Sequence, residues 1–528
     1  MSFENIGTLI ELLAYRAHVS ASKAAFTFNG IVCTFEELWR GVNRFAGLLP
    51  KLGVERHECV VVAMPNSKEF FFAFYGVQRA GGIAVPIFPG SGVERIFAIA
   101  KLCNAKVVVI PWRIAAMEVL ELQQAGVSRG LSVVTVEQSH GESEESDFPG
   151  ADPEDVAFIQ YTSGSTGNPK GVMLTHTDLL TNVRQMIAGM EITERDIFVS
   201  WLPVYHDMGL ILKTMVPFYL AAETHLLPTD LRDVKLWLET IQGQRATFTA
   251  SPDFAYRLVL SRVQSGEYDL SSLRVALNAA EPVRARTIHE FEKRFNLRPV
   301  MTAGYGLAEA TVGVSMSKPG RAPSVDGHGL VSVGKPFPDV EVKIVEAGET
   351  LKPGHVGEIL VKSKANCKGY YNNAEATQNL FQDGYILSGD IGYLDEEGEL
   401  YITGRKKNMI KHMGQTIAAQ ELEEIVDAMA AVRFSAAVGI DRGRLEGEQV
   451  YLFAELRNQN SVQACEELTL QIVEKIHEHL GMRPARIVFL KQHGIPRTHN
   501  GKIQHAFLRE QFLSGGLKED GLILYPEY

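Results

Sequence analysis

Four β-branched runs decide the fold: CVVVAM (59–64), IAVPIF (83–88), KVVVIP (106–111) and LSVVTV (131–136). Three helical stretches separate them: KEFFFAFYGVQRAG (68–81), VERIFAIAKLCNA (93–105) and AAMEVLELQQAG (115–126). Short strands that alternate with helices in this way are typical of βαβ units. The sequence therefore predicts a doubly wound α/β body, in which helices cover both faces of a largely parallel sheet.

The sequence pattern changes after this α/β body. Residues 139–155 are acidic and aperiodic, which predicts a surface connector before a strand at 156–161. After Gly304, turns separate short strands: VSVGKP (331–336), VEVKIV (340–345), VGEILVKS (356–363), YILSGD (385–390) and GELYITG (398–404). We expect these strands to pair in antiparallel fashion as a small, barrel-like subdomain.

The pattern changes again at GRKKNMIKHMG (404–414). Residues 418–432 have the spacing of an amphipathic helix, and they lead into a final α+β segment. We therefore expect an N-terminal domain at 1–406 and a C-terminal domain at 407–528, with the boundary near Lys407.

Composition narrows the class of protein. The 528 residues include 52 Lys and Arg against 63 Asp and Glu, a net charge of -11, which argues against broad capture of nucleic acid. The five cysteines are scattered without a CxxC pair, so neither a disulfide framework nor a zinc site is indicated. The first residues lack the basic start of an export signal, and no apolar run approaches the roughly 18 residues that span a bilayer. We expect a cytoplasmic protein without stable membrane insertion, whose partners are small molecules or proteins.

The stretch YTSGSTGNPKGVMLTH (161–176) has the residues of a phosphate-binding loop. Small side chains, free backbone N–H groups and hydroxyls wrap phosphate oxygens well, and a lysine adds positive charge. The residues concerned are Thr162, Ser163, Gly164, Ser165, Thr166, Gly167 and Lys170. The Walker A pattern does not fit this stretch. The alternative interpretation is a hydrophilic turn between a strand and a helix.

This loop resembles that of the adenylate-forming superfamily, which includes acyl-CoA synthetases, luciferases, peptide-synthetase adenylation domains and fatty acyl-AMP ligases. Four further motifs occur in the family order: YGLAEAT (305–311), SGD (388–390), GRKK (404–407) and PRTHNGK (496–502). The resemblance covers essentially the whole chain.

The resemblance implies a role for each motif. Tyr305, beside Gly306, would stack on adenine, and Asp390 would bind the ribose hydroxyls. Glu309 with Thr166 would hold Mg²⁺, and Lys502 would be the catalytic lysine, carried by a mobile C-terminal domain. Arg405 would belong to the hinge segment of that domain, with Lys407 at the hinge. Each has a structural alternative: Tyr305 as a core aromatic, the two carboxylates as solvated surface groups, and Lys502 as a surface charge.

The chemistry of acid activation explains why the residues named above suffice for catalysis. A carboxylic acid substrate is already ionised at neutral pH, so its attack on the α-phosphorus of ATP needs no general base. The reaction needs neutralisation of phosphate charge instead, which Mg²⁺, the loop amides, Thr166 and Lys502 would supply. No G-x-S-x-G or H-E-x-x-H motif competes with this interpretation.

Four segments resemble fatty acyl-AMP ligases in particular: WLPVYHDMGL (201–210), SPDFAY (251–256), DLSSLR (269–274) and NAAEP (278–282). That branch implies transfer of the acyl group to an acyl carrier protein. His206 would then lie at the carboxylate end of an acyl tunnel, unless it is a packed core histidine. Ala280 and Glu281 would border the nucleotide, although a small residue such as Ala280 also serves tight packing.

Two departures keep the acceptor open. The segment 312–330 is shorter than the insertion typical of acyl-AMP ligases, and GQTIAAQELE (414–423) resembles the acyl-CoA synthetase version equally. An acyl-CoA synthetase is therefore the alternative within the same chemistry. A non-catalytic nucleotide-binding scaffold is the alternative from another class, and it would be expected to lose Lys502, Glu309 or Asp390, all of which are present.

Overall fold

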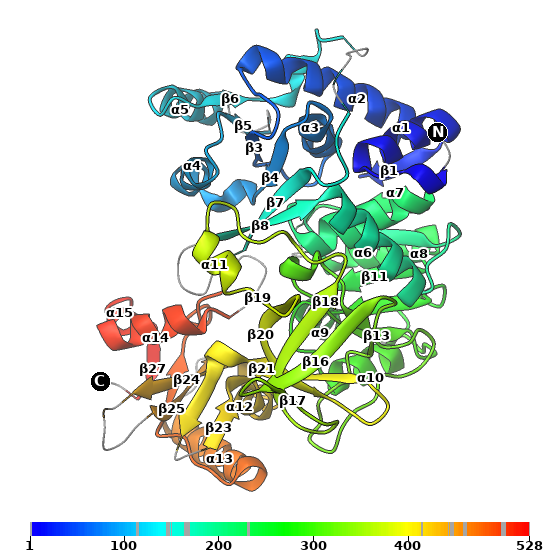
Figure 1. The fold of residues 1–528 in the computed structure, drawn as a ribbon. Coiled ribbons are helices and arrows are strands. Elements are labelled where there is room, and N and C mark those ends of the chain that lie inside the picture. The colour runs from blue at the N-terminus through cyan, green and yellow to red at the C-terminus, as the bar shows by residue number, and fades with distance from the viewer. Residues whose placement is uncertain are drawn as a thin grey trace.

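The computed structural model describes residues 3–111, 116–143, 148, 150–162, 169–229, 233–412, 415–441, 443, 448–457, 462–497 and 503–526. Its large N-terminal part combines two mixed α/β sheets with an antiparallel sheet, and the smaller C-terminal part is α+β (Figure 1). This is the predicted fold class.

The first sheet has the strand order β6-β5-β3-β4-β7-β8. Its strands are β3 (Cys59–Val62), β4 (Ile83–Pro86), β5 (Val107–Val109), β6 (Ser132–Val134), β7 (Val156–Thr162) and β8 (Lys170–Thr175), and only β8 runs antiparallel to its neighbour. The helices that connect them are α3 (Lys68–Arg79), α4 (Val93–Leu102) and α5 (Ala116–Val127). Val60 and Val62 pack in the same core as α3, whereas Val61 packs with α4. Alternate residues of one strand thus face opposite helical layers, which confirms the predicted βαβ body.

The second sheet has the order β15-β14-β13-β12-β11-β9-β10-β1-β2. Its strands are β1 (Ala24–Phe28), β2 (Ile31–Thr34), β9 (Ile197–Ser200), β10 (Glu223–Leu226), β11 (Phe248–Ser251), β12 (Val275–Asn278), β13 (Met301–Tyr305), β14 (Ser315–Met316) and β15 (Lys335–Pro336). The accompanying helices are α1 (Leu9–Val19), α2 (Phe35–Leu48), α6 (His176–Gly189), α7 (Val216–Leu220), α8 (Val234–Gln244), α9 (Asp253–Arg262) and α10 (Ala285–Arg294). Because β9, β11, β12 and β13 are parallel, their carboxyl ends meet at one edge, where ligands bind in such sheets.

The third sheet is antiparallel and forms a half-barrel, as the strand pattern after Gly304 predicts. It contains β16 (Val340–Glu346), β17 (Glu349–Thr350), β18 (Gly357–Ser363), β19 (Phe381–Gln382), β20 (Tyr385–Leu394) and β21 (Leu400–Arg405), with α11 (Ala374–Gln378) between β18 and β19. The run VSVGKP departs from the prediction: only its last two residues form a strand, and this strand pairs with β14 of the second sheet. Gly334 allows this pairing, since it has a positive φ and a Cβ there would lie 2.0 Å from the Met316 carbonyl oxygen.

The C-terminal part has its own core. It contains the hairpin β22 (Met409–His412) and β23 (Gln415–Ala418), the sheet β24 (Val432–Asp441), β25 (Glu448–Leu456), β26 (Arg486–Leu490) and β27 (Ile523–Tyr525), and the helices α12 (Ala419–Asp427), α13 (Val462–Leu480), α14 (His505–Ser514) and α15 (Gly516–Glu519). The helix predicted over 418–432 is shorter, because Val432 already begins β24. The hinge at Lys407 and the boundary between 406 and 407 stay predictions.

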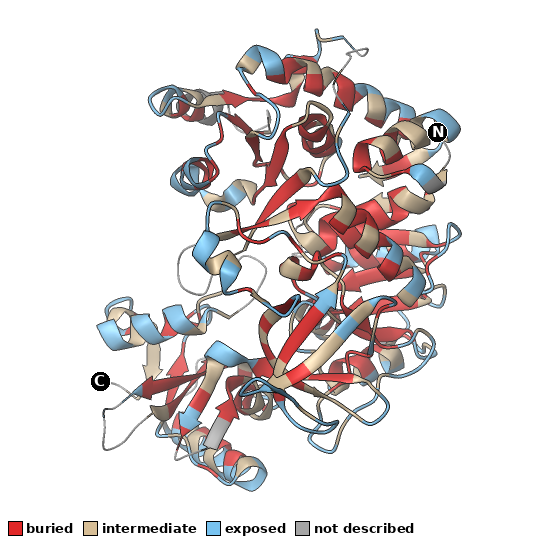
Figure 2. Ribbon diagram, in the orientation of Figure 1, coloured by how far each residue is buried: buried red, intermediate tan, exposed pale blue. Residues whose placement is uncertain are grey.

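Short helical turns complete the chain: η1 (Phe3–Asn5), η2 (Leu49–Leu52), η3 (Pro89–Ser91), η4 (Val136–Ser139), η6 (Ala308–Ala310), η7 (Lys406–Asn408) and the π-helix η5 (Met208–Met215). Buried residues concentrate in the central strands of the sheets and on the helix faces toward them (Figure 2). Lys213 of η5 is an exception to the apolar core, because it is 0% exposed. Its Nζ donates to the Phe248 carbonyl oxygen at 3.2 Å and lies 4.8 and 4.6 Å from the ring centroids of Phe198 and Phe248. Burial lowers the pKa of Lys213 well below its usual value.

Lys213 is expected to make the stability of the protein increase with pH. Between its folded and unfolded pKa values the unfolded chain carries a proton that the folded chain has released, so the free energy of unfolding rises with pH by at most about 1.4 kcal/mol per unit. Urea denaturation of the natural chain and of Lys213→Met, from neutral pH to pH near the unfolded lysine value, measures this difference. Parallel pH dependences for the two proteins would contradict the prediction.

Candidate active site

A cleft of about 2280 Å³ lies at the carboxyl edge of the second sheet, between the N-terminal and C-terminal parts. Residues from both parts line it, including Tyr305 of β13, Asp390 of β20 and Glu423 of α12. The sequence-predicted site residues on it are Thr162, Lys170, Ala280, Glu281, Tyr305, Gly306, Glu309, Asp390 and Arg405. Four motifs from distant parts of the chain therefore share one cleft.

Asp390 organises the centre of this cleft. It is 3% exposed, its Oδ2 accepts a hydrogen bond from the Tyr305 hydroxyl at 2.6 Å, and its Oδ1 lies 2.5 Å from Arg405 Nε. Antiparallel pairing of β20 with β21 sets Arg405 opposite Asp390. Burial and the neighbouring carboxylate raise the pKa of Tyr305 well above its usual value. The cluster presents a neutral phenol beside a carboxylate whose charge Arg405 balances.

Gly306 explains how the chain turns directly after Tyr305. A Cβ at this position would lie 1.6 Å from the Val312 carbonyl oxygen, so a side chain cannot be accommodated without moving backbone. The close approach holds the turn that directs Tyr305 toward Asp390.

Gly306→Ala is expected to lower the free energy of unfolding by about 1–3 kcal/mol and to raise the KM for ATP, because the backbone must shift to admit the methyl group. Urea denaturation and initial rates measure the two effects. Gly327→Ala is the matched control: no atom lies within 4 Å of its added Cβ, and a surface change of this kind stays within about 0.5 kcal/mol. Equal behaviour of the two variants would contradict the close-approach argument.

Tyr370 links the predicted metal ligand to the phosphate-loop lysine. Its hydroxyl donates to Glu309 Oε1 at 2.8 Å, and the ammonium of Lys170 lies 4.8 Å from the centroid of its ring. Burial and Glu309 raise the pKa of Tyr370. Sequence reasoning missed Tyr370, since no motif of the chain singles it out.

The strands β7 and β8 pair in antiparallel fashion, and the helix α6 begins only after β8. This differs from the strand-to-helix turn considered as the structural alternative to a phosphate-binding loop. Thr162 ends β7 and its hydroxyl donates to the Lys170 carbonyl oxygen at 3.4 Å. The predicted loop residues Ser163, Gly164, Ser165, Thr166 and Gly167 lie outside the described residues.

The donor set around Glu309 fits Mg²⁺ that arrives with a nucleotide. Within the described part of the chain, no three His, Cys, Asp or Glu side chains gather as a preformed metal cage. Mg²⁺ usually takes one or two carboxylates together with substrate phosphates and water. The half-buried carboxylate of Glu309 on the cleft provides such a ligand.

Ala280 and Glu281 border the cleft in an unusual backbone conformation. Ala280 is exposed and has a φ of 71°, which turns the chain sharply after β12. Glu281 accepts a hydrogen bond from the backbone N–H of Phe254. Burial and the nearby Asp253 raise the pKa of Glu281 to about 7, so this carboxyl titrates near neutral pH.

His206 lies beside the cleft. It is half-buried, its backbone N–H donates to the Pro203 carbonyl oxygen at 3.2 Å, and its ring centroid is 5.3 Å from that of Tyr205. Among the described lining residues, its neighbours Asp207 and Met208 are present and His206 is not.

Five apolar residues of the cleft lining, which we call the apolar arm, also escaped sequence analysis. They are Met186, Met190, Trp201, Leu212 and Leu258, and they come from α6, the end of β9, η5 and α9. A surface of this kind accommodates a hydrocarbon chain.

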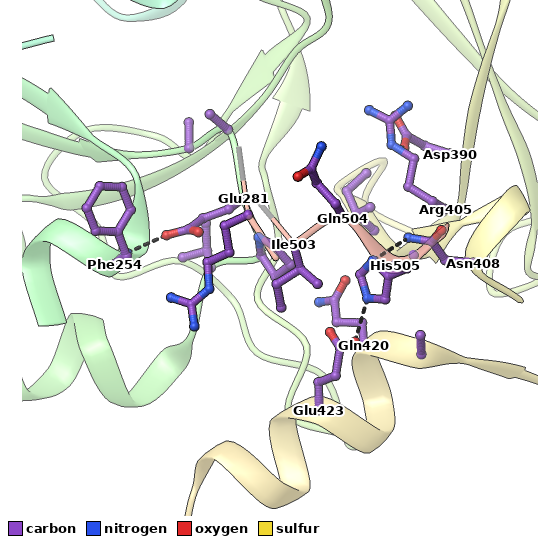
Figure 3. A pocket seen from close by; sticks show the side chains of 18 of the residues that line it. Phe254, Glu281, Asp390, Arg405, Asn408, Gln420, Glu423, Ile503, Gln504 and His505 are labelled. Atoms are coloured by element: carbon purple, nitrogen blue, oxygen red, sulfur yellow. Dashed lines mark hydrogen bonds and ion pairs between the residues drawn. The ribbon is translucent and has the colours of Figure 1, made fainter. Parts of the chain in front are cut away.

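The C-terminal part contributes to the cleft lining the described residues on either side of the predicted catalytic lysine, Arg497 and Ile503. Lys502 lies outside the described residues. Its neighbour Ile503 lines the cleft with Gln504 and His505, in the company of Glu281 and Asp390 (Figure 3). Ile503 forms a β-bridge with Arg497, and the N–H of Gln504 donates to the Pro496 carbonyl oxygen at 2.9 Å, so the two ends of this segment are held together.

Comparison with known proteins identifies close matches in sequence and fold. A family model described as AMP-binding enzyme matches residues 13–371. The medium-chain fatty acid–acyl-carrier-protein ligase JamA of Moorena producens (strain JHB) is 30% identical, over 98% of this chain and 97% of the relative. The putative fatty-acid–CoA ligase fadD21 of Mycobacterium leprae (strain TN) is 26% identical, over 96% of this chain and 98% of the relative.

A solved structure from work on fatty acyl-adenylate ligases of E. coli and L. pneumophila superposes with a TM-score of 0.87. It is 26% identical, and the match covers 98% of this chain and all of the other. Within the described residues, every helix is too short or too polar to cross a membrane.

Proposed function

The chain belongs to the AMP-binding enzyme family, and on this premise we propose that it activates a fatty or related carboxylic acid with ATP and Mg²⁺ and passes the acyl group to the phosphopantetheine thiol of an acyl carrier protein. The observation that carries this proposal is the shared cleft, in which the Tyr305, Asp390 and Arg405 cluster and Glu309 meet an apolar arm.

The first half-reaction forms an acyl adenylate. A carboxylate oxygen of the acid forms a bond to the α-phosphorus of ATP, and the bond from that phosphorus to the bridging oxygen breaks as pyrophosphate leaves. In the second half-reaction the thiol attacks the acyl carbon, AMP leaves, and the thiol proton passes to solvent. No side chain needs to remove a proton from the acid, because it is already ionised.

The residues of the cleft divide the binding of ATP among them. Tyr305 presents its ring to adenine, with Ala280 and Glu281 at the edge of the base. The carboxylate of Asp390 accepts the ribose hydroxyls, and Arg405 pairs with that carboxylate. The phosphate loop, from Thr162 to Lys170, surrounds the phosphates with N–H groups, hydroxyls and one ammonium.

Three further assignments complete the site. Glu309 with Thr166 would hold Mg²⁺, which when bound neutralises phosphate charge. Lys502 donates hydrogen bonds to the phosphate oxygens on which negative charge builds as pyrophosphate leaves. His206 lies at the end of the apolar arm where the carboxylate of the fatty acid binds. Residues 407–528 turn about Lys407 between the two half-reactions, which brings Lys502 to the cleft for the first and withdraws it for the second.

The acceptor is assigned to a carrier protein on the similarity to JamA, which is named as an acyl-carrier-protein ligase and matches almost the whole chain. A CoA acceptor is the second candidate, because fadD21, which covers the chain similarly, is named as a putative CoA ligase. Purified protein with radiolabelled fatty acids of several lengths, MgATP and either CoA or a panel of holo carrier proteins separates the two. We expect acyl carrier protein to be labelled and CoA to remain free; efficient acyl-CoA formation would overturn the assignment.

A further inference from the structure

Arg284 joins the two parts of the molecule through a pair of buried carboxylates. Its Nη1 lies 3.0 Å from Asp253 Oδ2, on α9 of the N-terminal part, and its Nη2 lies 2.7 Å from Asp427 Oδ2, on α12 of the C-terminal part. The side chains of Asp253 and Asp427 are 0% and 7% exposed. A bond between charges that are this well shielded from water is strong and specific in geometry.

The two ends of this bridge are unequal. Asp253 has other partners within the N-terminal part: an ion pair with Arg257 Nε at 3.0 Å, and hydrogen bonds from Asn278 Nδ2 at 2.9 Å and from the backbone N–H of Arg284 at 3.4 Å. Asp427 accepts a hydrogen bond from the hydroxyl of Ser435 at 2.8 Å within its own part, and among the described residues its ion pair is with Arg284. If the two parts separate, Arg284 and Asp253 still neutralise each other. The charge that loses its cation is the carboxylate of Asp427.

A second contact crosses the boundary beside the first. The guanidinium of Arg257 lies 5.3 Å from the ring centroid of Phe434, the residue before Ser435. On the C-terminal side, the guanidinium of Arg497 lies 3.5 Å from the same ring and is paired with the buried Glu455 at 3.2 Å. Arg497 borders the segment that contains Lys502, and its β-bridge partner Ile503 lines the cleft. The contact of Arg257 with Phe434 across the boundary is therefore linked, through Arg497, to the end of the segment that contains Lys502.

We propose that the Arg284–Asp427 ion pair is a clasp that holds the C-terminal part in the orientation in which Arg497 and Ile503, the described residues on either side of Lys502, border the cleft. Asp427 is then a positioning residue for acyl-adenylate formation, and the clasp opens for thiol transfer. The proposal rests on the proposed function, because it assigns the clasp to one of its two half-reactions. A purely structural role for Asp427 predicts a different outcome: both half-reactions would fall together with stability.

The test compares Asp427→Asn with a matched control. Asparagine can keep an oxygen that accepts from Ser435, and it replaces the charged oxygen that accepts from Arg284 by an amide NH2 group, which only donates. The control is Asp196→Asn, which breaks a similarly buried pair, with Arg274 Nη2 at 3.0 Å, inside the N-terminal part. Acid-dependent ATP–pyrophosphate exchange measures the first half-reaction, and transfer from synthetic acyl-AMP to the thiol acceptor measures the second.

We expect Asp427→Asn to slow exchange about tenfold, within the range of typical coupling between sites, and to leave transfer from acyl-AMP unchanged or faster. Asp196→Asn should leave the ratio of the two rates unchanged, whatever it does to stability. An equal fall in both half-reactions with Asp427→Asn would overturn the proposal.

A distance measurement tests the clasp without catalysis. The five native cysteines are all buried, so spin labels attach selectively to His289→Cys on α10 and Leu470→Cys on α13, both exposed positions. Asp427→Asn should broaden the distribution of distances between these labels, whereas Asp196→Asn should not. An unchanged distribution would overturn the clasp. Absence of exchange in the natural chain with every acid would instead overturn the proposed function, and the label distances would still decide whether the clasp exists.

Discussion

Lys502→Ala is expected to slow acid-dependent ATP–pyrophosphate exchange by about 10²- to 10³-fold, the effect of removing one donor worth about 2.7–4 kcal/mol to a transition state in which charge develops. The reacting carboxylate and the polyphosphate are both anions, so the barrier is largely electrostatic. An ammonium at this place lowers it because its charge acts on the transferring phosphoryl group in a site that excludes water. The exchange rate at saturating ATP and acid measures the effect.

Lys518→Ala is the matched control, since Lys518 is another lysine of the C-terminal part and lies exposed on α15. Its rate of ATP–pyrophosphate exchange should equal that of the natural chain, and both variants should have the same unfolding temperature as the natural chain. An unchanged exchange rate in Lys502→Ala would show that the C-terminal motif has been misread. Absence of exchange in the natural chain with every acid would favour the non-catalytic scaffold.

The strands of the N-terminal body were predictable because each is a β-branched run that is buried on both sides. In β3, for example, Val60 and Val61 face different helical layers, so neither face can carry a polar residue. The edge strands were harder. Lys335–Pro336 joins the second sheet through two residues, and its pairing depends on the backbone of Gly334 against Met316 rather than on a hydrophobic pattern.

The site was partly predictable for a related reason. Tyr305 ends β13 and Thr162 ends β7, so both lie at the carboxyl ends of strands, and both line the cleft. Contacts between distant side chains left no local signal. Tyr370 reaches Glu309 across 61 residues of chain, and Arg284 reaches Asp427 across 143. The apolar arm was invisible for another reason: Met186 or Leu258 on an amphipathic helix looks the same whether it faces a core or a cleft.

Asp390 is held in one orientation by its neighbours in the cleft. Its two carboxylate oxygens already engage the Tyr305 hydroxyl and Arg405 Nε. A carboxylate oxygen has more than one acceptor direction, so ribose hydroxyls can be added while Arg405 stays in place. The existing bonds fix the orientation of the carboxylate before ATP arrives, which reduces the entropy that binding must lose.

Asp390→Ala is expected to lower kcat/KM for ATP by about 10²-fold. Each hydrogen bond from a ribose hydroxyl to a charged acceptor contributes about 1.5–3 kcal/mol. The net loss is smaller than the sum for two such bonds, because the carboxylate is already engaged by Tyr305 and Arg405 before ATP binds. The KM for the fatty acid should change little, since the apolar arm is formed by other residues.

Asp326→Ala is the matched control: Asp326 accepts a hydrogen bond from the Tyr393 hydroxyl at 2.7 Å, as Asp390 accepts one from Tyr305, without lining the described part of the cleft. Steady-state rates with ATP varied, read beside thermal unfolding, separate lost nucleotide binding from lost stability. If both variants raise the KM for ATP equally, the ribose assignment of Asp390 is wrong.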